Sequence, residues 1–216
     1  MSKKIILTLL AILVFACVIR LYHLSFPAIG FHSMKENVFI SMARNMVKSG
    51  DYWTRRVDFQ EYLPMSGGYL TAWQTVLCLH IFGENFLAAA RGLNLLFFLG
   101  AILYAYLLAA YVSRSSFIGL LTAFIMAILP LGNYFAKNLQ PESAGLFFML
   151  MFQYHGAQFI VSRKMMDFYL GVLACMAILL LKVSFLLGMI PLLGMCVYAE
   201  TLPKKFFRIH FGERCY

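Results

Sequence analysis

The chain has 216 residues, of which 62% are hydrophobic and only 12% charged, and its formal net charge is +9 at pH 7. A typical soluble domain carries about 25% charged residues, so this composition excludes an ordinary soluble protein and predicts an all-α polytopic membrane protein. No nucleic-acid-binding motif accompanies the positive charge, so we expect its partner to be a lipid bilayer or a phosphate group and not nucleic acid.

Uncharged runs predict about six transmembrane helices within a single domain over residues 1–216. A spanning helix needs roughly 17–25 apolar residues. The first run must therefore continue past Arg20 to Leu24, and the fifth must include Met165 and Met166 across Asp167. The first run resembles a signal peptide without a small-x-small cleavage site, which indicates an uncleaved anchor. The runs are Ile5–Ile19, Gly92–Ser113, Ser115–Ala136, Ser143–Ser162, Phe168–Leu181 and Val183–Ala199.

Basic residues in the short linkers predict the orientation. Positive residues in short loops mark the cytoplasmic side of a membrane, so we expect both termini, including a tail over residues 200–216, to be cytoplasmic. We therefore expect a multi-pass integral membrane protein. Three segments lie outside: a large first loop over residues 25–90, a short loop around Asn133–Glu142, and a turn at Lys182. The basic residues on the inner side are Lys3, Lys4, Arg114, Arg163, Lys164, Lys204, Lys205 and Arg208.

The large outer loop concentrates charge. Nine of the 27 charged residues lie between Phe31 and Glu61, which indicates that water, a partner or a substrate is present there. Glu36 could act as a general base on an acceptor hydroxyl, and Lys35 beside it could hold a phosphate. An ordinary solvated loop beside the membrane explains the same residues equally well.

The segment Tyr62–Gly83 follows this charged stretch and is also long and uncharged. Its Pro, Gly, Gln and His residues suit a spanning helix poorly, so we expect a juxtamembrane helix at the outer interface, anchored by Trp53, Tyr69 and Trp73. If the segment spanned the membrane instead, every later loop would change sides.

Three further charged residues are candidates. Glu142 follows Pro141, which is a helix-start signal, and it could also be a second carboxylate facing Glu36 across an outer cavity. Lys182 is a turn residue or a ligand for an anionic headgroup, and Glu61 leads into the Pro/Gly-broken segment. His155 has no carboxylate three or four residues away, so we expect a packed or interfacial histidine.

The order of these segments is more specific than any one of them. One predicted span precedes an outer loop that contains Phe-His-Ser-Met-Lys-Glu36 and Met-Ala-Arg-Asn-Met-Val-Lys-Ser-Gly-Asp51. Glu61…Pro64 and Ile-Phe-Gly83 follow, and Pro-Glu-Ser143 closes the next outer loop. This order resembles the N-terminal half of the GT-C membrane glycosyltransferases, among them the bacterial relatives of protein O-mannosyltransferases and the lipid A aminoarabinose transferase.

The resemblance implies transfer of a sugar from a polyprenyl-phosphate carrier to a glycan, lipid or protein acceptor on the outer face, by direct displacement at the anomeric carbon. It places Glu36 in the region that supplies the catalytic base and Glu142 at the acidic position of the second outer loop. Lys182 matches a lysine near the carrier phosphate, and Glu61 matches the acidic residue before the interfacial helix.

Departures from the family pattern leave alternatives open. A single carboxylate, Glu36, stands where many relatives have Asp-Glu, and no lysine follows Glu61, although Lys35, Arg55 or Arg56 could replace it. Such enzymes are also usually much longer, so we expect a truncated or split enzyme, or else a non-catalytic fragment or lipid-carrier-binding subunit. A transporter is disfavoured because no inverted repeat is visible. The sequence requires no cofactor or metal site, and a divalent cation is compatible with the outer carboxylates.

Overall fold

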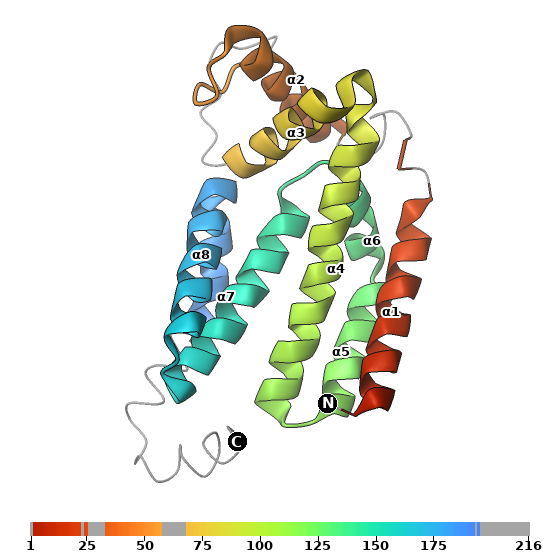
Figure 1. The fold of residues 1–216 in the computed structure, drawn as a ribbon, viewed down its shortest axis with the longest axis vertical. Coiled ribbons are helices and arrows are strands. Elements are labelled where there is room, and N and C mark those ends of the chain that lie inside the picture. Colours follow the sequence, from red (N-terminus) through yellow and green to blue (C-terminus); the bar gives the residue numbers. More distant parts are fainter. Residues whose placement is uncertain (1, 23, 26–32, 58–67, 193, 195–216) are drawn as a thin grey trace.

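The computed structural model describes residues 2–22, 24–25, 33–57, 68–192 and 194, and within these ranges every regular element is a helix. Long helices lie side by side in a bundle, and two shorter helices lie across one end of it (Figure 1). The predicted all-α class is confirmed for this part of the chain.

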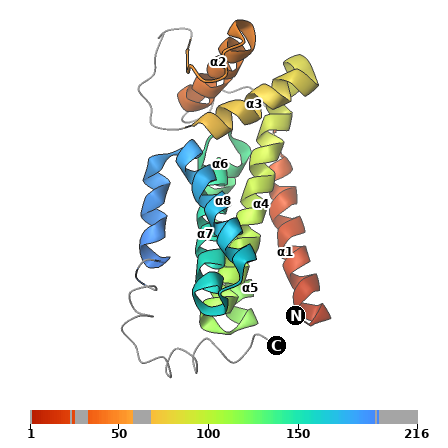
Figure 2. The same cartoon turned by 60° about the vertical axis from the view of Figure 1, so that its left-hand side comes forward.

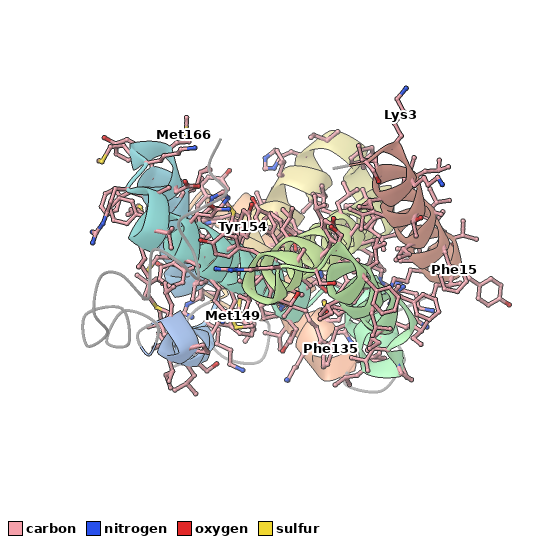
Figure 3. The ribbon with its side chains drawn as sticks, turned by 90° about the horizontal axis from the view of Figure 1, so that it is seen from below. Lys3, Phe15, Phe135, Met149, Tyr154 and Met166 are labelled. Carbon is pink, nitrogen blue, oxygen red and sulfur yellow. The ribbon has the colours of Figure 1, made fainter. Side chains whose placement is uncertain are left out.

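Helix α1 (Lys3–Leu21) forms one edge of the bundle, opposite the edge formed by α8 with Met166 (Figure 3). The Ser2 side chain accepts a hydrogen bond from the Ile5 N–H and so caps its first turn. The helix ends at Leu21, before the predicted Leu24, because the backbone of Tyr22 is extended. Leu7 and Val18 are more than half exposed, as expected for side chains that face lipid.

Helix α2 (Ser33–Ser49) and helix α3 (Tyr69–Phe82) lie across the end of the bundle. Apart from His80, the exposed residues of α3 are apolar, with Leu77 at 55% and Ile81 at 63%, while Thr71, Gln74 and Thr75 are buried. Polar groups inside and apolar groups outside are the arrangement of a helix that faces lipid. A short 3₁₀ turn, Gly83–Asn85, then leads into α4 (Phe86–Ser113), the longest helix.

The third predicted span, Ser115–Ala136, is broken in the structure. Helix α5 (Ser116–Ile128) and helix α6 (Pro130–Lys137) meet at an angle of 64°. Pro130 causes the break, because proline has no N–H to donate and its ring clashes with the preceding turn. The outer loop predicted around Asn133–Glu142 is accordingly too long, since its first residues belong to α6.

Arg20 of α1 donates hydrogen bonds to two backbone carbonyls, one in α1 and one at this break. Its side chain is fully buried, donates hydrogen bonds of 2.9 Å to the carbonyl oxygens of Ala16 and Ala127, and stacks over the Phe98 ring at 4.6 Å. The Ala127 carbonyl lies in the last turn of α5, where the helix itself supplies no donor. Arg20 therefore joins α1 to the broken span.

The fourth and fifth predicted runs are helical in the structure, as α7 (Glu142–Ser162) and α8 (Met165–Leu181), and of the two only α7 is long enough to count as a span. Pro141 precedes α7 and Glu142 lies in its first turn, so the predicted helix-start signal is confirmed. After Lys182 the chain turns into a 3₁₀ helix, Val183–Met189, and the segment runs back beside α8 (Figure 2).

By length and composition, three helical segments are able to cross a membrane: Lys3–Leu21, Tyr69–Ser113 and Glu142–Ser162. The bent pair α5 and α6 raises the number to four if it counts as one span, while Met165–Leu181 and Val183–Leu192 are shorter apolar helices. The protein thus has the character of a membrane protein. The N-terminal end of α1 and the α4–α5 and α7–α8 connections lie at the end away from α2 and α3 (Figure 1).

Replacement of Arg20 by Met tests the role of this arginine at the break. The substitution preserves an apolar stem but removes the donors to Ala127, so we expect it to lower the free energy of unfolding by about 1.5–3 kcal/mol. Unfolding of the purified protein by SDS titration in mixed micelles measures this change. Val18→Met on the lipid-facing side of α1 is the matched control, and equal stability of the two variants would contradict this role for Arg20.

Candidate functional site

Glu36 forms a buried ion pair in the first turn of α2. Its two carboxylate oxygens accept hydrogen bonds from Arg91 of α4, at 2.7 Å from Nε and 2.9 Å from Nη2. Both side chains are only 4% exposed. A paired, fork-like geometry of this kind is the strongest form of an arginine–carboxylate contact. Glu36 is thus fixed against the start of α4.

Two backbone groups form further hydrogen bonds with the side chains of this ion pair. The N–H of Leu139, in the α6–α7 connection, donates to Glu36 Oε1 at 3.0 Å, and Arg91 Nη1 donates to the carbonyl oxygen of Leu24 at 2.8 Å. The pair therefore joins the segment after α1, the first turn of α2, the start of α4 and the α6–α7 connection.

A second set of hydrogen bonds lies beside the first. Asn94 of α4 donates to the carbonyl oxygens of Asn138 and Gln140, the latter at 2.9 Å. Gln74 of α3 donates in turn to Asn94 Oδ1 at 3.2 Å and to the Ala90 carbonyl oxygen at 2.9 Å. Since these side chains are buried, they hold α3 and the α6–α7 connection against α4.

Glu142 lies close to the residue that precedes Glu36. Lys35 Nζ is 3.9 Å from Glu142 Oε1. The structure thus brings the two predicted carboxylates to the same end of the bundle. Their surroundings differ, because Glu142 Oε2 is buried and accepts no hydrogen bond from any described residue.

A cavity of about 240 Å³ lies beside Glu142. Its wall is almost wholly apolar, and Glu142 is its one charged member among the described residues. The side chains that line it come from α4, α5, α6, α7 and the 3₁₀ helix after α8, and they include Phe98, Met126, Leu129, Phe135, Leu146 and Phe185.

The predicted arginines lie after α2. Arg55 is 8% exposed and stacks at 4.6 Å over the Tyr69 ring, which neighbours Trp53 and Trp73. Arg56 is exposed, and its carbonyl oxygen accepts a hydrogen bond from Asn45. These arginines thus lie in the α2–α3 connection, Arg55 against the start of α3 and Arg56 beside α2.

Asp51 shapes the turn that carries these residues. A side-chain hydrogen bond with Thr54 and the backbone N–H groups of Trp53 and Thr54 lower the pKa of Asp51. The carboxylate is therefore ionised at neutral pH. Because its pKa is lowered in the folded protein, its contribution to the turn is present at neutral pH and is lost as the pH falls through the folded-state pKa.

Lys182 and Glu61 complete the predicted set. Lys182 is exposed at the C-terminal end of α8, and the preceding carbonyl, that of Leu181, accepts a hydrogen bond from the Gly68 N–H at the start of α3. Lys182 is therefore at the same end of the bundle as α3. Glu61 lies outside the described residues.

A buried cluster at the other end of the bundle was missed by sequence analysis. His155 of α7 lies 2.9 Å from Asp167 Oδ1 of α8 through Nδ1, and its Nε2 lies 3.1 Å from the Tyr104 hydroxyl of α4. The prediction of a packed histidine considered only neighbours three or four residues away, whereas Asp167 is twelve residues away across the α7–α8 turn. The sequence feature that could have indicated this cluster is Asp167, a single charged residue beside the apolar run Phe168–Leu181.

The described residues contain no group of three or more His, Cys, Asp or Glu side chains placed to hold a metal ion. The two carboxylates of the candidate site instead have cations as neighbours, Arg91 for Glu36 and Lys35 for Glu142. The arrangement suits proton transfer and anion binding.

Glu36→Gln tests how firmly the buried pair holds this end of the bundle. It leaves the Arg91 charge buried and unpaired, so we expect a loss of about 3–5 kcal/mol in the free energy of unfolding. Glu84→Gln, in the exposed pair of Arg44 and Glu84, should cost about 0–1 kcal/mol. SDS titration compares the two. Equal losses would contradict the assignment, whereas partial recovery in the double variant Glu36→Leu/Arg91→Leu would support it.

The chain was also compared with protein families, curated proteins and solved structures, and no match was found in any of the three.

Proposed function

We propose that the chain is a glycosyltransferase module that moves a sugar from a polyprenyl-phosphate carrier to an acceptor at the outer face of a bacterial inner membrane. The observation that carries the proposal is the meeting of Glu36, Glu142 and Lys35 at one end of an apolar helical bundle. We further propose about six spans, with α2 and α3 outside and both termini in the cytoplasm. The basic linkers at the opposite end support this orientation.

The proposed reaction is a direct displacement. The acceptor oxygen attacks the anomeric carbon, the bond from that carbon to the carrier phosphate breaks, and the phosphate leaves with the electrons of that bond. The acceptor proton moves to a carboxylate. Such a step needs one carboxylate able to accept a proton and cations near the phosphate.

Glu142 suits the role of the base in this proposal. Its Oε2 accepts no hydrogen bond from the described residues and it lies beside a cavity. Glu36 is less suited, because both of its oxygens accept hydrogen bonds from Arg91 and one also accepts from Leu139. We assign Glu36 the role of positioning the α6–α7 connection, from which Glu142 follows.

Four cations are available for the carrier phosphate. Lys35 is half exposed next to Glu142, and Lys182 is exposed at the same end of the bundle. Arg55 and Arg56 come from the α2–α3 connection. Arginine can bind a phosphate through two parallel hydrogen bonds, and lysine acts as a point charge. In this proposal Glu61 is the acidic residue that precedes the interfacial helix in the sequence.

A lipid-carrier-binding subunit without transfer activity is the second candidate. The observation that favours it is the full engagement of Glu36, the carboxylate that the family resemblance places at the base position. The cations would then hold the carrier for a partner. Transfer and binding therefore need separate measurements.

Glu142→Gln should abolish transfer but preserve the fold. The amide has nearly the same shape as the carboxylate but cannot accept the proton, so we expect the rate to fall about 10²–10⁴-fold. Membranes that contain the full chain, supplied with a radiolabelled polyprenyl-phosphate sugar, provide the measurement. Glu84→Gln, which changes an exposed carboxylate, should retain the wild-type rate. Unchanged transfer by Glu142→Gln would remove Glu142 from the mechanism.

Lys182→Met should weaken carrier binding, because it removes a positive charge from the outer end of α8. We expect the affinity of the purified protein for a short-chain polyprenyl monophosphate to fall about tenfold, which corresponds to 1.4 kcal/mol. Lys164→Met, at the opposite end of α8, is the matched control. If both variants bind like the wild type, Lys182 is only a turn residue.

A further inference from the structure

The connection between α6 and α7 is irregular, yet it is largely buried. It covers residues 138–141, and within it Leu139 and Gln140 are 0% and 1% exposed. Connections normally run over the surface, where water satisfies their N–H and carbonyl groups, whereas buried backbone groups need partners inside the protein. This connection obtains such partners from side chains of other helices, and Glu142 is the residue that follows it.

Asn94 of α4 and Glu36 of α2 bind this backbone together. The Leu139 N–H donates to Glu36 Oε1 at 3.0 Å. The carbonyl oxygen of the same peptide group, that of Asn138, accepts a hydrogen bond from Asn94 Nδ2. Nδ2 also donates to the Gln140 carbonyl oxygen at 2.9 Å. Because Asn94 is 0% exposed, both hydrogens of its amide serve the connection and not water.

Gln74 of α3 determines the orientation of the Asn94 amide. Its Nε2 donates to Asn94 Oδ1 at 3.2 Å and to the Ala90 carbonyl oxygen at 2.9 Å. A flipped Asn94 amide would place its oxygen against two carbonyl oxygens and its nitrogen against the Gln74 donor. The hydrogen bonds therefore favour one orientation, in which Asn94 presents its donors to the connection.

The hydrogen bond to the Gln140 carbonyl restricts the position of Glu142. That carbonyl and the Pro141 nitrogen belong to one planar peptide group, and the proline ring restricts the next dihedral angle, φ, which is −71°. The Pro141 carbonyl oxygen accepts a hydrogen bond from the Gly145 N–H at 2.8 Å, in the first turn of α7. Little rotational freedom thus remains between the carbonyl that Asn94 binds and the backbone of Glu142.

We infer that Asn94 is a positioning residue for Glu142: by holding the carbonyls of Asn138 and Gln140, it sets the place of the carboxylate that acts as the base. The inference rests on the proposed function for the reaction in which Glu142 takes part. A displacement of about 1 Å lowers the rate of such a step on the order of 100-fold, so the hold on this connection has a kinetic consequence beyond stability. Asn94 acts through the connection and is not itself a catalytic residue.

Backbone hydrogen exchange of the full chain in phosphatidylcholine nanodiscs tests the hold of Asn94 without any substrate. Asn94→Ala removes both donors and adds no charge, so we expect the backbone of residues 138–142 to exchange about tenfold faster than in the wild type. Asn85→Ala is the matched control, because Asn85 is exposed just before α4 and its side chain makes no capping hydrogen bond. Unchanged exchange in Asn94→Ala would overturn the inference.

The transfer assay measures the consequence for the reaction. With a radiolabelled polyprenyl-phosphate sugar, Asn94→Ala should lower kcat at least about tenfold and change KM less than about twofold, because the proposed cations Lys35 and Lys182 stay in place. Rates are expressed per binding-competent protein, titrated with a short-chain polyprenyl monophosphate at a temperature where circular dichroism shows the variant folded. A wild-type kcat in folded Asn94→Ala would contradict the positioning role.

The double variant Asn94→Ala/Glu142→Gln separates positioning from general loss of structure. If Asn94 acts by placing the Glu142 carboxylate, its substitution should change the residual rate of Glu142→Gln less than about twofold, since the group that it positions is already absent. A purely structural role predicts the same further loss in this background as in the wild type, and that result would also overturn the inference.

Gln74→Leu is a milder second variant, because it keeps both bonds from Asn94 to the connection and removes only the donor that orients its amide. We expect changes in exchange and kcat in the same direction, of about threefold. If Asn94→Ala does not fold, Gln74→Leu decides alone, and wild-type exchange and kcat would then overturn the inference. If the wild type itself transfers no sugar, the proposed function fails, and the positioning role fails with it. If the wild type transfers sugar and folded Asn94→Ala transfers it equally well, only the inference fails.

Discussion

The end of the bundle that α2 and α3 cover depends on the buried ion pair of Glu36 and Arg91. Two charges that are both 4% exposed are costly in a low-dielectric setting, and their mutual attraction offsets that cost only when the geometry is good and further hydrogen bonds satisfy the remaining groups. The N–H of Leu139 and the carbonyl of Leu24 supply those bonds. Because the partners come from four separate segments, satisfying the pair also fixes those segments relative to one another.

The two carboxylates at this end, Glu36 and Glu142, consequently differ in their surroundings. Glu36 has its acceptor sites taken by an arginine and a backbone N–H, so its oxygens serve as a fixed point of the fold. Glu142 has only a lysine at 3.9 Å and a buried oxygen with no hydrogen bond from the described residues. A group that holds structure and a group that accepts a proton need opposite surroundings, and the surroundings of Glu36 and Glu142 differ in this way at one end of the bundle.

The sequence predicted the elements better than the contacts between them. Uncharged runs located α7 and α8, and Pro141 with Glu142 marked the start of α7. The break at Pro130 was not predicted, because the run Ser115–Ala136 was identified as a span only by its length and lack of charge. The partner of Glu36 lies 55 residues away in the chain and that of His155 twelve residues away. Periodicity and local spacing carry no information about such pairs, because only tertiary packing brings them together. The gathering of Glu36, Lys35 and Glu142 followed from the order of the outer segments.

The polar clusters at the two ends also account for where the packing is incomplete. Arg91 with Glu36 fixes α4 against α2 at one end, and Tyr104, His155 and Asp167 fix α4, α7 and α8 at the other. Between these ends glycines allow close packing, and a Cβ atom on Gly100 or Gly145 would lie within 2.6 Å of a phenylalanine ring. Helices restrained at both ends cannot slide to close a gap. The gap therefore remains where Pro130 interrupts a helix, and Glu142 lies beside it.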